Sequence, residues 1–254
     1  MNALQWVDLG ERFDADLLEE AYREVYLPAF PVRDEQEDPA IWTPRLTDPD
    51  PHPRLSFLVM GTRLDDPIAR RVLGLLVAEY YAASRCMLVS YVAVAEAARR
   101  QGVARRLFDL LAARIRSGHA SAQQPVAAVL AEIHDPAVTP PGEDVLDPAA
   151  RLAVMARLGA CRIPVHYIQP ALSADQAPAH GLWLVAYPKL VNDPTALTAQ
   201  RVRDFLVEFY DALGSADPLR DSVYAATFAS VDALAAATAC GQPLLEALTD
   251  EYPC

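Results

Sequence analysis

The sequence predicts a mixed α/β fold that carries a helical extension at its C-terminal end. Over the first 190 residues, apolar and β-branched runs of strand length alternate with segments whose apolar residues recur at helical spacing. The chain has 254 residues, 52% of them hydrophobic, so it can bury a large core. We expect an α/β domain over residues 1–190. Residues 191–254 should pack on it, because about sixty residues are too few for a stable domain of their own.

Three strands and a helix are predicted in the first 81 residues. A strand over residues 4–9 precedes a helix over residues 14–27, which Pro28 is expected to end because proline cannot continue a helix. Two strands then follow, over residues 55–61 and 72–81. The proline-rich, acidic segment between Pro28 and the second strand shows no periodicity. A loop of this length is usually functional or disordered.

The stretch from residue 86 to residue 115 is the most informative part of the chain. A strand over residues 87–95 leads into the turn Arg99-Arg100-Gln101-Gly102, and an amphipathic helix begins at Val103. The first N–H groups of a helix have no partner within it, and the helix dipole and the arginines add positive charge there. Glycine lets an anion approach the backbone closely. The turn is therefore an anion site or, alternatively, an ordinary solvated connection.

The rest of the chain continues the α/β pattern and then becomes helical. A strand is predicted over residues 126–133. A helix over residues 149–158 is introduced by Asp147-Pro148 and ended by Gly159. The same Asp-Pro pair recurs at residues 193–194 and 217–218. Further strands are predicted at 163–168 and 182–187, and helical segments at 202–213, 223–239 and 244–248.

The central stretch resembles the GNAT superfamily of acyl-CoA-dependent N-acyltransferases. The run from Arg99 to Ala104 fits that family's (Q/R)-x-x-G-x-(G/A) turn, and the preceding SYVAVAEAA resembles its pantetheine-holding strand. The resemblance covers about residues 3–188. It implies a mixed, mostly antiparallel central sheet flanked by helices, with acetyl-CoA or another acyl-CoA as co-substrate in a cleft where two strands part. The residues it assigns to CoA are Val92, Ala93, Val94, Arg99, Arg100, Gln101, Gly102, Val103, Ala104 and Arg105.

Candidate catalytic residues follow from the chemistry of acyl transfer, which needs a base for the amine. Glu132 interrupts an apolar strand beside the predicted CoA strand, where burial would raise its pKa; the alternative is a solvated acid at a sheet edge. His134 shares a sheet face with Glu132 and could relay a proton. The family's general-acid tyrosine corresponds to Met155, which cannot donate a proton. Either no dedicated acid exists or another tyrosine substitutes, with Tyr167 the first choice and Tyr91 the second.

The acceptor site is expected in the acidic loop after the first helix, because the corresponding segment in GNAT enzymes commonly forms the acceptor pocket. Phe30, Glu35 and Trp42 are the candidate substrate-binding residues; the alternative is a solvated acidic loop. The C-terminal helices are expected to pack on the α/β body, cover the acceptor side or make a homodimer contact.

Composition limits the remaining classes of function. The net charge of −12 disfavours nucleic-acid binding, and no apolar run reaches the ~20 residues that span a membrane. Four scattered cysteines argue against a zinc site or a disulfide framework and, without a signal peptide, predict a cytoplasmic protein that uses no metal. We predict an enzyme that moves an acetyl or other short acyl group to an amine of a small molecule. The alternatives are transfer to a hydroxyl group, a protein N-acetyltransferase, and a non-catalytic acyl-CoA sensor or interaction module.

Overall fold

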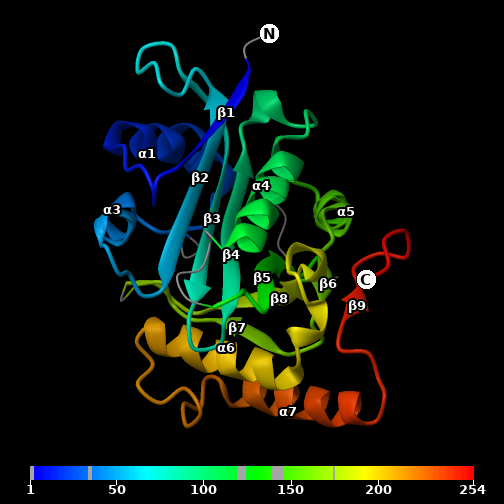
Figure 1. Ribbon diagram of the computed structural model, residues 1–254. Helices are drawn as coiled ribbons and strands as arrows, with labels where there is room; N and C mark the ends of the chain where they lie inside the picture. Colours follow the sequence, from blue (N-terminus) through cyan, green and yellow to red (C-terminus); the bar gives the residue numbers. More distant parts are fainter. Residues whose placement is uncertain (1–2, 34–35, 119–123, 139–145, 174) are drawn as a thin grey trace.

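A mixed, mostly antiparallel sheet with helices on both faces forms the centre of the computed structural model, as the sequence predicts (Figure 1). The structure describes residues 3–33, 36–118, 124–138, 146–173 and 175–254. The strand order is β1-β2-β3-β4-β5-β8-β6-β9, and β7 also pairs with β8. The strands are β1 Leu4–Asp8, β2 Arg54–Thr62, β3 Arg71–Tyr81, β4 Cys86–Val94, β5 Ala128–His134, β6 Cys161–Arg162, β7 Tyr167–Gln169, β8 Ala179–Ala186 and β9 Glu246–Ala247.

The strands from β1 to β4 form an antiparallel meander, and β4 then pairs with β5 in parallel. The parallel step is possible because helix α4, Val103–Ser117, crosses from the end of β4 back to the start of β5. Helix α4 lies on one face of the sheet, near α5, Pro148–Leu158 (Figure 1). A Cβ on Gly74 of β3 would lie 2.8 Å from Val103 Cγ1, so glycine there lets the start of α4 approach the sheet.

The other face of the meander is covered by the N-terminal helices. Helix α1, Ala15–Ala21, continues through a π-helical turn at Tyr22–Tyr26 into α2, Leu27–Ala29. We expected Pro28 to end this helix, but Pro28 lies within its last turn. The predicted loop also contains a helix, α3, Pro39–Thr47, whose N-cap Asp38 accepts a hydrogen bond from the Ala40 N–H. Asp38-Pro39 is the same helix-starting pair that marks Asp147-Pro148, so the sequence did contain this signal.

The C-terminal helices cover the same face farther along the sheet, over β5 and β8 (Figure 1). Helices α6, Ala199–Ala212, and α7, Ala225–Ala239, bury one continuous core with these strands. Two predictions were wrong here. Residues 244–248 contain strand β9, which pairs with β6, rather than a helix. Of the strand predicted over residues 163–168, only residues 167–168 are in a strand, β7; strand β6 lies before the predicted range, and Pro164 lies between β6 and β7. Short 3-10 helices occur at Glu96–Ala98, Pro188–Leu190 and Pro194–Ala196. None of the helices described is long and apolar enough to cross a bilayer.

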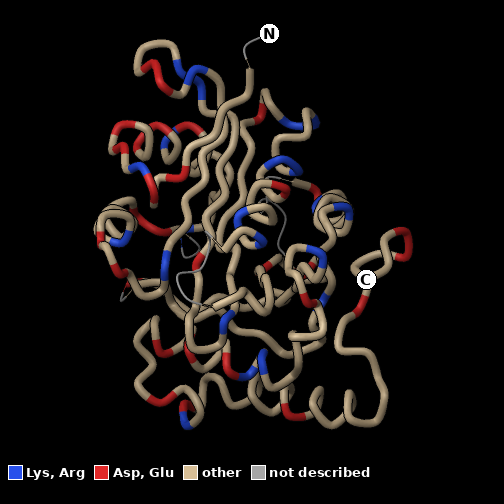
Figure 2. Tube along the Cα trace, in the orientation of Figure 1, with Lys and Arg blue, Asp and Glu red and all other residues tan. Residues whose placement is uncertain are grey.

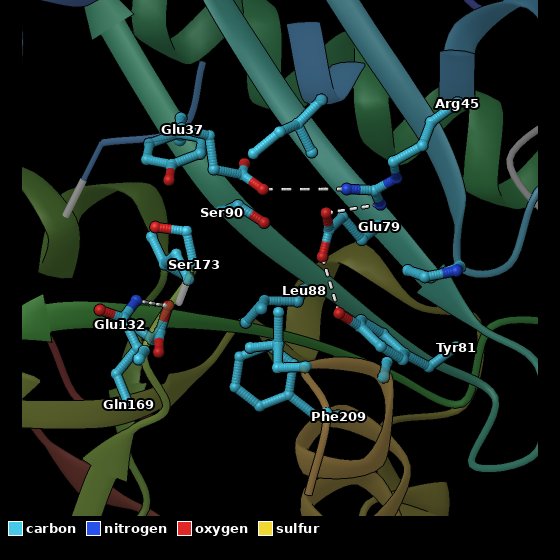
Figure 3. Close-up of a pocket in the computed structure, with 18 of the residues that line it drawn as sticks. Glu37, Arg45, Glu79, Tyr81, Leu88, Ser90, Glu132, Gln169, Ser173 and Phe209 are labelled. Atoms are coloured by element: carbon cyan, nitrogen blue, oxygen red, sulfur yellow. Dashed lines mark hydrogen bonds and ion pairs between the residues drawn. The ribbon is translucent and has the colours of Figure 1, made fainter. Parts of the chain in front are cut away.

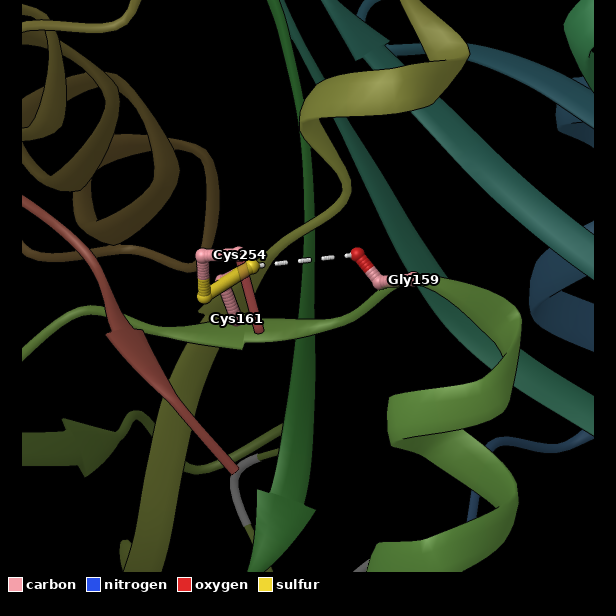
Figure 4. Close-up of a disulfide and its surroundings, with 3 residues drawn as sticks. All are labelled: Gly159, Cys161 and Cys254. Carbon is pink, nitrogen blue, oxygen red and sulfur yellow. Dashed lines mark hydrogen bonds between the residues drawn. A yellow bond between two sulfur atoms is a disulfide. The ribbon is translucent and has the colours of Figure 1, made fainter. Parts of the chain in front are cut away.

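A disulfide joins two cysteines that we did not expect to meet. Cys161 on β6 is bonded to Cys254, 93 residues away, whereas Cys86 and Cys240 are free (Figure 4). The wide spacing argued against a bridge, but strand β9 returns the C-terminal segment to β6. The sulfur atoms meet because of tertiary structure that cysteine spacing alone does not reveal.

We predict that the denatured, unreduced protein titrates with two free thiols out of its four cysteines. Cys254→Ser should lower the free energy of unfolding in urea by about 2–4 kcal/mol, because the bridge closes a long loop in the unfolded chain. Cys240→Ser, at an exposed free cysteine, is the matched control and should leave stability unchanged. Four free thiols in protein purified without reductant would contradict the bridge.

Candidate functional site

The site begins where strands β4 and β5 part. Their parallel pairing runs from Cys86↔Ala128 to Val89↔Ala131 and stops there. Beyond this point β5 remains paired with β8, through Glu132↔Leu184 and His134↔Leu182, while β4 remains paired with β3. The residues of β4 after Val89 therefore have an open edge on the side that faces away from β3.

The backbone of Val92 and Val94 faces this open edge. The Ala95 N–H donates to the Leu73 carbonyl at 2.9 Å, so alternate residues of β4 point their backbone groups at β3. By that alternation Ala93 pairs with β3, and the N–H and C=O groups of Val92 and Val94 point the other way. The Val94 carbonyl accepts a bond from Arg99 Nε at 3.4 Å, on the side away from β3. An extended chain with amide groups can pair along such an edge.

The turn after β4 leaves the start of α4 without a side-chain cap. Gly102 occupies the N-cap position with φ +79°, and no side-chain hydrogen bond satisfies the first N–H groups of the helix. A Cβ at Gly102 would meet no described atom within 4 Å. Glycine is needed here for its left-handed backbone, and the space before the helix is open. In Figure 2 the blue of Lys and Arg appears on the trace at this turn.

The side chains of the turn flank that space without closing it. Arg100, also at positive φ, and Arg105 are exposed, and Arg105 pairs with Asp109 at 3.0 Å. Gln101 Nε2 donates to the Ala97 carbonyl at 2.8 Å, which holds the turn together. Val103 is buried in the core beneath α4, and Ala104 is half-buried. The uncapped backbone and the exposed arginines are suited to an anion such as a pyrophosphate.

A cavity of about 610 Å³ lies beside the parting strands, on the face opposite α4 (Figure 3). Its wall combines strands β3, β4 and β5 with α3, the segment after β7 and the end of α6. The charged residues that line it are three carboxylates and one guanidinium, together with the exposed His52. Its lining residues include Glu37, Arg45, Glu79, Leu88, Ser90, Tyr91, Glu132, Gln169, Ser173, Phe209 and Leu213.

Glu132 is held in place by two donors. Gln169 Nε2 donates to Oε2 at 2.9 Å, and the Tyr167 hydroxyl donates to Oε1. Burial, and then the charge of Glu132, raise the pKa of Tyr167 well above its usual value. The structure thus brings together two of the residues predicted from sequence. Because the Tyr167 hydroxyl donates its hydrogen bond to Glu132, Tyr167 supports that carboxylate. This contact does not decide between the two alternatives for the general acid, a substitute tyrosine or none.

A second charged group lines the cavity farther along β3. Arg45 Nη2 lies 2.6 Å from Glu79 Oε1, and Nη1 lies 3.9 Å from Glu37 Oε1. The Tyr81 hydroxyl donates to Glu79 at 2.7 Å. Trp42 Nε1 donates to Glu37 at 2.8 Å. Burial, and then the nearby charge of Glu79, raise the pKa of Glu37 to about 7. This carboxyl group therefore changes charge near neutral pH.

The other predicted site residues lie around the cavity rather than in its lining. The Trp42 ring is fully buried and bonds to Glu37 from behind the wall. Phe30 is half-buried, with its ring 5.1 Å from that of Tyr91. His134 lies on β5 two residues past Glu132, outside the cavity lining. Glu35 lies outside the described residues. Met155 on α5 contacts the Tyr187 hydroxyl at 3.5 Å.

The sequence analysis missed several groups in the cavity wall. Arg45 and Glu79 belong to no recognisable sequence motif. They meet because α3 packs on the meander. Gln169 is the last residue of β7 and lies one residue beyond the strand predicted over residues 163–168. Glu37, by contrast, belongs to the acidic loop in which the acceptor site was expected, and it lines the cavity just before the helix-starting pair Asp38-Pro39. Among the residues that the structure describes, no group of three His, Cys, Asp or Glu side chains is placed to hold a metal ion.

We predict that Glu37 makes stability depend on pH. Its pKa is about 7 in the folded protein and near 4.5 when solvated, so the folded state holds the extra proton between these values. The free energy of unfolding should therefore fall as pH rises from about 4.5 to about 7. Glu37→Gln, which stays neutral, should remove a slope worth on the order of 1–3 kcal/mol.

Urea unfolding at a series of pH values measures this slope. Glu19→Gln, at an exposed carboxylate on α1, is the matched control and should keep the wild-type slope. Equal slopes in wild type and Glu37→Gln would show that Glu37 does not titrate in this range.

Comparison with known proteins gives one family and several similar structures. The model of the acetyltransferase (GNAT) family matches residues 19–130. A GNAT-family acetyltransferase from Bacteroides thetaiotaomicron, itself described as putative, has a TM-score of 0.50 at 14% identity, covering 80% of this chain and 93% of that one. This likeness concerns the fold.

Two further structures are similar at lower scores. The ribosomal-protein-S18-alanine N-acetyltransferase of Escherichia coli has a TM-score of 0.45 at 14% identity, covering 73% of this chain and 92% of that one. A GNAT-family acetyltransferase from Elizabethkingia anophelis, with acetyl-CoA bound, has a TM-score of 0.42 at 10% identity, covering 72% and 96%. No curated protein sequence matches this chain.

Proposed function

We propose that this chain, whose residues 19–130 belong to the GNAT family of acetyltransferases, moves an acetyl or other short acyl group from acyl-CoA to an amine of a small molecule. The observation that carries the proposal is the alignment of three features along β4. These are the uncapped start of α4, the open edge at Val92 and Val94, and the cavity where β4 and β5 part. They provide, in order, sites for a pyrophosphate, an amide-bearing arm and an acyl acceptor.

The acceptor is best matched by a cationic amine. Three carboxylates and one guanidinium line the cavity, so its charge is negative when Glu79 and Glu132 are ionised. Walls of low polarity strengthen the attraction of such a site for an ammonium group. The cavity is bounded by α3, the segment after β7 and the end of α6, which supports a small molecule over a protein segment.

Glu132 is the proposed base. Its carboxylate lines the cavity one residue past the last β4–β5 pair, and Tyr167 and Gln169 fix its orientation. It accepts a proton from the ammonium form of the acceptor, which frees the nitrogen lone pair for attack on the thioester carbon. His134 remains a candidate relay on the same strand.

Of the two alternatives for the general acid, we propose that the thiolate leaves without a dedicated tyrosine. Met155 occupies the family position, and burial raises the pKa of both Tyr91 and Tyr167 well above the usual value. A phenol whose pKa lies far above that of a thiol does not readily give its proton to a thiolate. The thiolate therefore leaves as the anion and takes its proton from solvent.

We expect acetyl-CoA to bind with micromolar affinity in a calorimetric titration and Gly102→Trp to abolish that binding. The indole would fill the space before α4, where the phosphates are proposed to lie. Gly118→Trp is a closely matched control, because Gly118 ends the same helix at φ +78° with the same free space around it. It carries the same backbone strain but should bind normally. Failure of folded wild-type protein to bind acetyl-CoA would refute the proposed function.

Glu132→Gln should lower turnover by about 100-fold or more while leaving acetyl-CoA affinity unchanged, because it removes the base and keeps the shape. Release of CoA thiol in the presence of acetyl-CoA and a panel of small primary amines measures turnover. Glu246→Gln, at an exposed residue of β9, is the control. Binding of acetyl-CoA without any turnover in wild type would instead favour a non-catalytic acyl-CoA sensor.

A further inference from the structure

Ser90 lies on β4 at the point where β4 and β5 part. In the β3–β4 pairing, Val89 faces Ala78 and Tyr91 faces Val77, so Ser90 is an extra residue without a cross-strand partner on β3. The pairing with β5 ends one residue earlier, at Val89↔Ala131. Ser90 is therefore a β-bulge at the apex of the split, and bulges re-aim side chains beside functional sites.

The Ser90 side chain faces the cavity, and the bulge brings its neighbour to the same side. Leu88 and Ser90 both line the cavity, as alternate residues of a strand do, and Tyr91 lines it as well because of the extra residue. Figure 3 shows Ser90 between the Glu37–Glu79 side of the cavity and Glu132. Its Oγ is buried and has no hydrogen-bond partner among the described residues. A buried hydroxyl in this state points to a partner supplied by a ligand.

The direction of the donor site indicates which ligand atom reaches Ser90. The phosphate end is proposed to lie at the start of α4, which follows the C-terminal end of β4. An arm that runs back along Val94 and then Val92 reaches Ser90 last, after about four residues or ~13 Å of strand. The group at the far end of the arm is the thioester, so its carbonyl arrives at the bulge.

We propose that Ser90 is a further catalytic residue, whose hydroxyl donates a hydrogen bond to the thioester carbonyl oxygen and to the oxyanion that forms from it. This inference rests on the proposed function. Ser90 on β4 acts on the thioester carbonyl, whereas Glu132 on the neighbouring strand β5 acts on the amine.

In the proposed step the amine nitrogen, after losing one proton to Glu132, forms a bond to the carbonyl carbon, and the C=O π pair moves onto oxygen. The Ser90 hydroxyl stabilises that charge without giving up its proton. When the pair returns to carbon, the C–S bond breaks, its electrons leave on the thiolate, and the nitrogen loses its second proton to solvent as the thiolate gains one.

Infrared difference spectra of bound acetyl-CoA, labelled with ¹³C at the carbonyl, test the hydrogen bond without any acceptor. The bound carbonyl should absorb at lower frequency in wild type than in Ser90→Ala, and Ser90→Thr should restore the wild-type position because it keeps the hydroxyl. Ser222→Ala, at an exposed serine, is the control. Calorimetry should show that all four proteins bind acetyl-CoA.

Turnover with the amine panel supplies the second readout. Ser90→Ala should lower kcat about 100-fold, as loss of one oxyanion donor does, with little change in KM for the amine. An unchanged carbonyl frequency in Ser90→Ala that still binds acetyl-CoA would overturn the inference and leave the proposed function intact. A rise in amine KM with kcat preserved would also overturn it. Failure of wild type to bind acetyl-CoA would refute the proposed function itself.

Discussion

The end of pairing between β4 and β5 is the constraint on which the rest of the site depends. Only four pairs join these strands, and each strand is held beyond that point by its other neighbour, β3 or β8. Two well-paired strands thus diverge from a common apex, and among the described residues one edge of β4 has no neighbouring strand after Val89. The open edge of β4 and the placement of Glu132 follow from this geometry, and the bulge at Ser90 lies at its apex.

Because different helices pack on the two faces of the sheet, the open end of the split and its apex carry groups of opposite charge. Helix α4 begins just past β4, so positive charge and free N–H groups collect at the open end. Carboxylates collect at the apex on the opposite face, where α3 and α6 close over the strands. An anionic donor and a cationic acceptor would therefore approach from opposite faces, and their reactive groups would meet at the apex.

Local sequence was sufficient to predict the strand, turn and helix of the proposed donor side and insufficient to predict the cavity of the proposed acceptor side. The strand, turn and helix from Cys86 to Ser117 are contiguous, and their apolar spacing and Gly102 specify them directly. The pairing of Tyr167 with Glu132 depends on β7 and β5 meeting β8, and the contact of Arg45 with Glu79 depends on α3, a helix that we missed. Ser90 looked like an ordinary strand residue because the bulge arises from the register of two strands, which sequence periodicity does not show.

The cavity wall is contributed by two separate lengths of chain. Glu37, Arg45 and Ser90 lie within the segment that the family model matches, whereas Glu132, Gln169 and the α6 residues Phe209 and Leu213 lie after it. Substitutions or insertions in the later segment can reshape one side of the chamber without altering the turn or the open edge of β4. Under the proposed function, selectivity for the acceptor can therefore diverge between descendants of this protein while the donor side stays fixed. Directed evolution of new acceptors is best confined to the cavity-lining residues after Gln169, which leaves the proposed base Glu132 and its two donors in place.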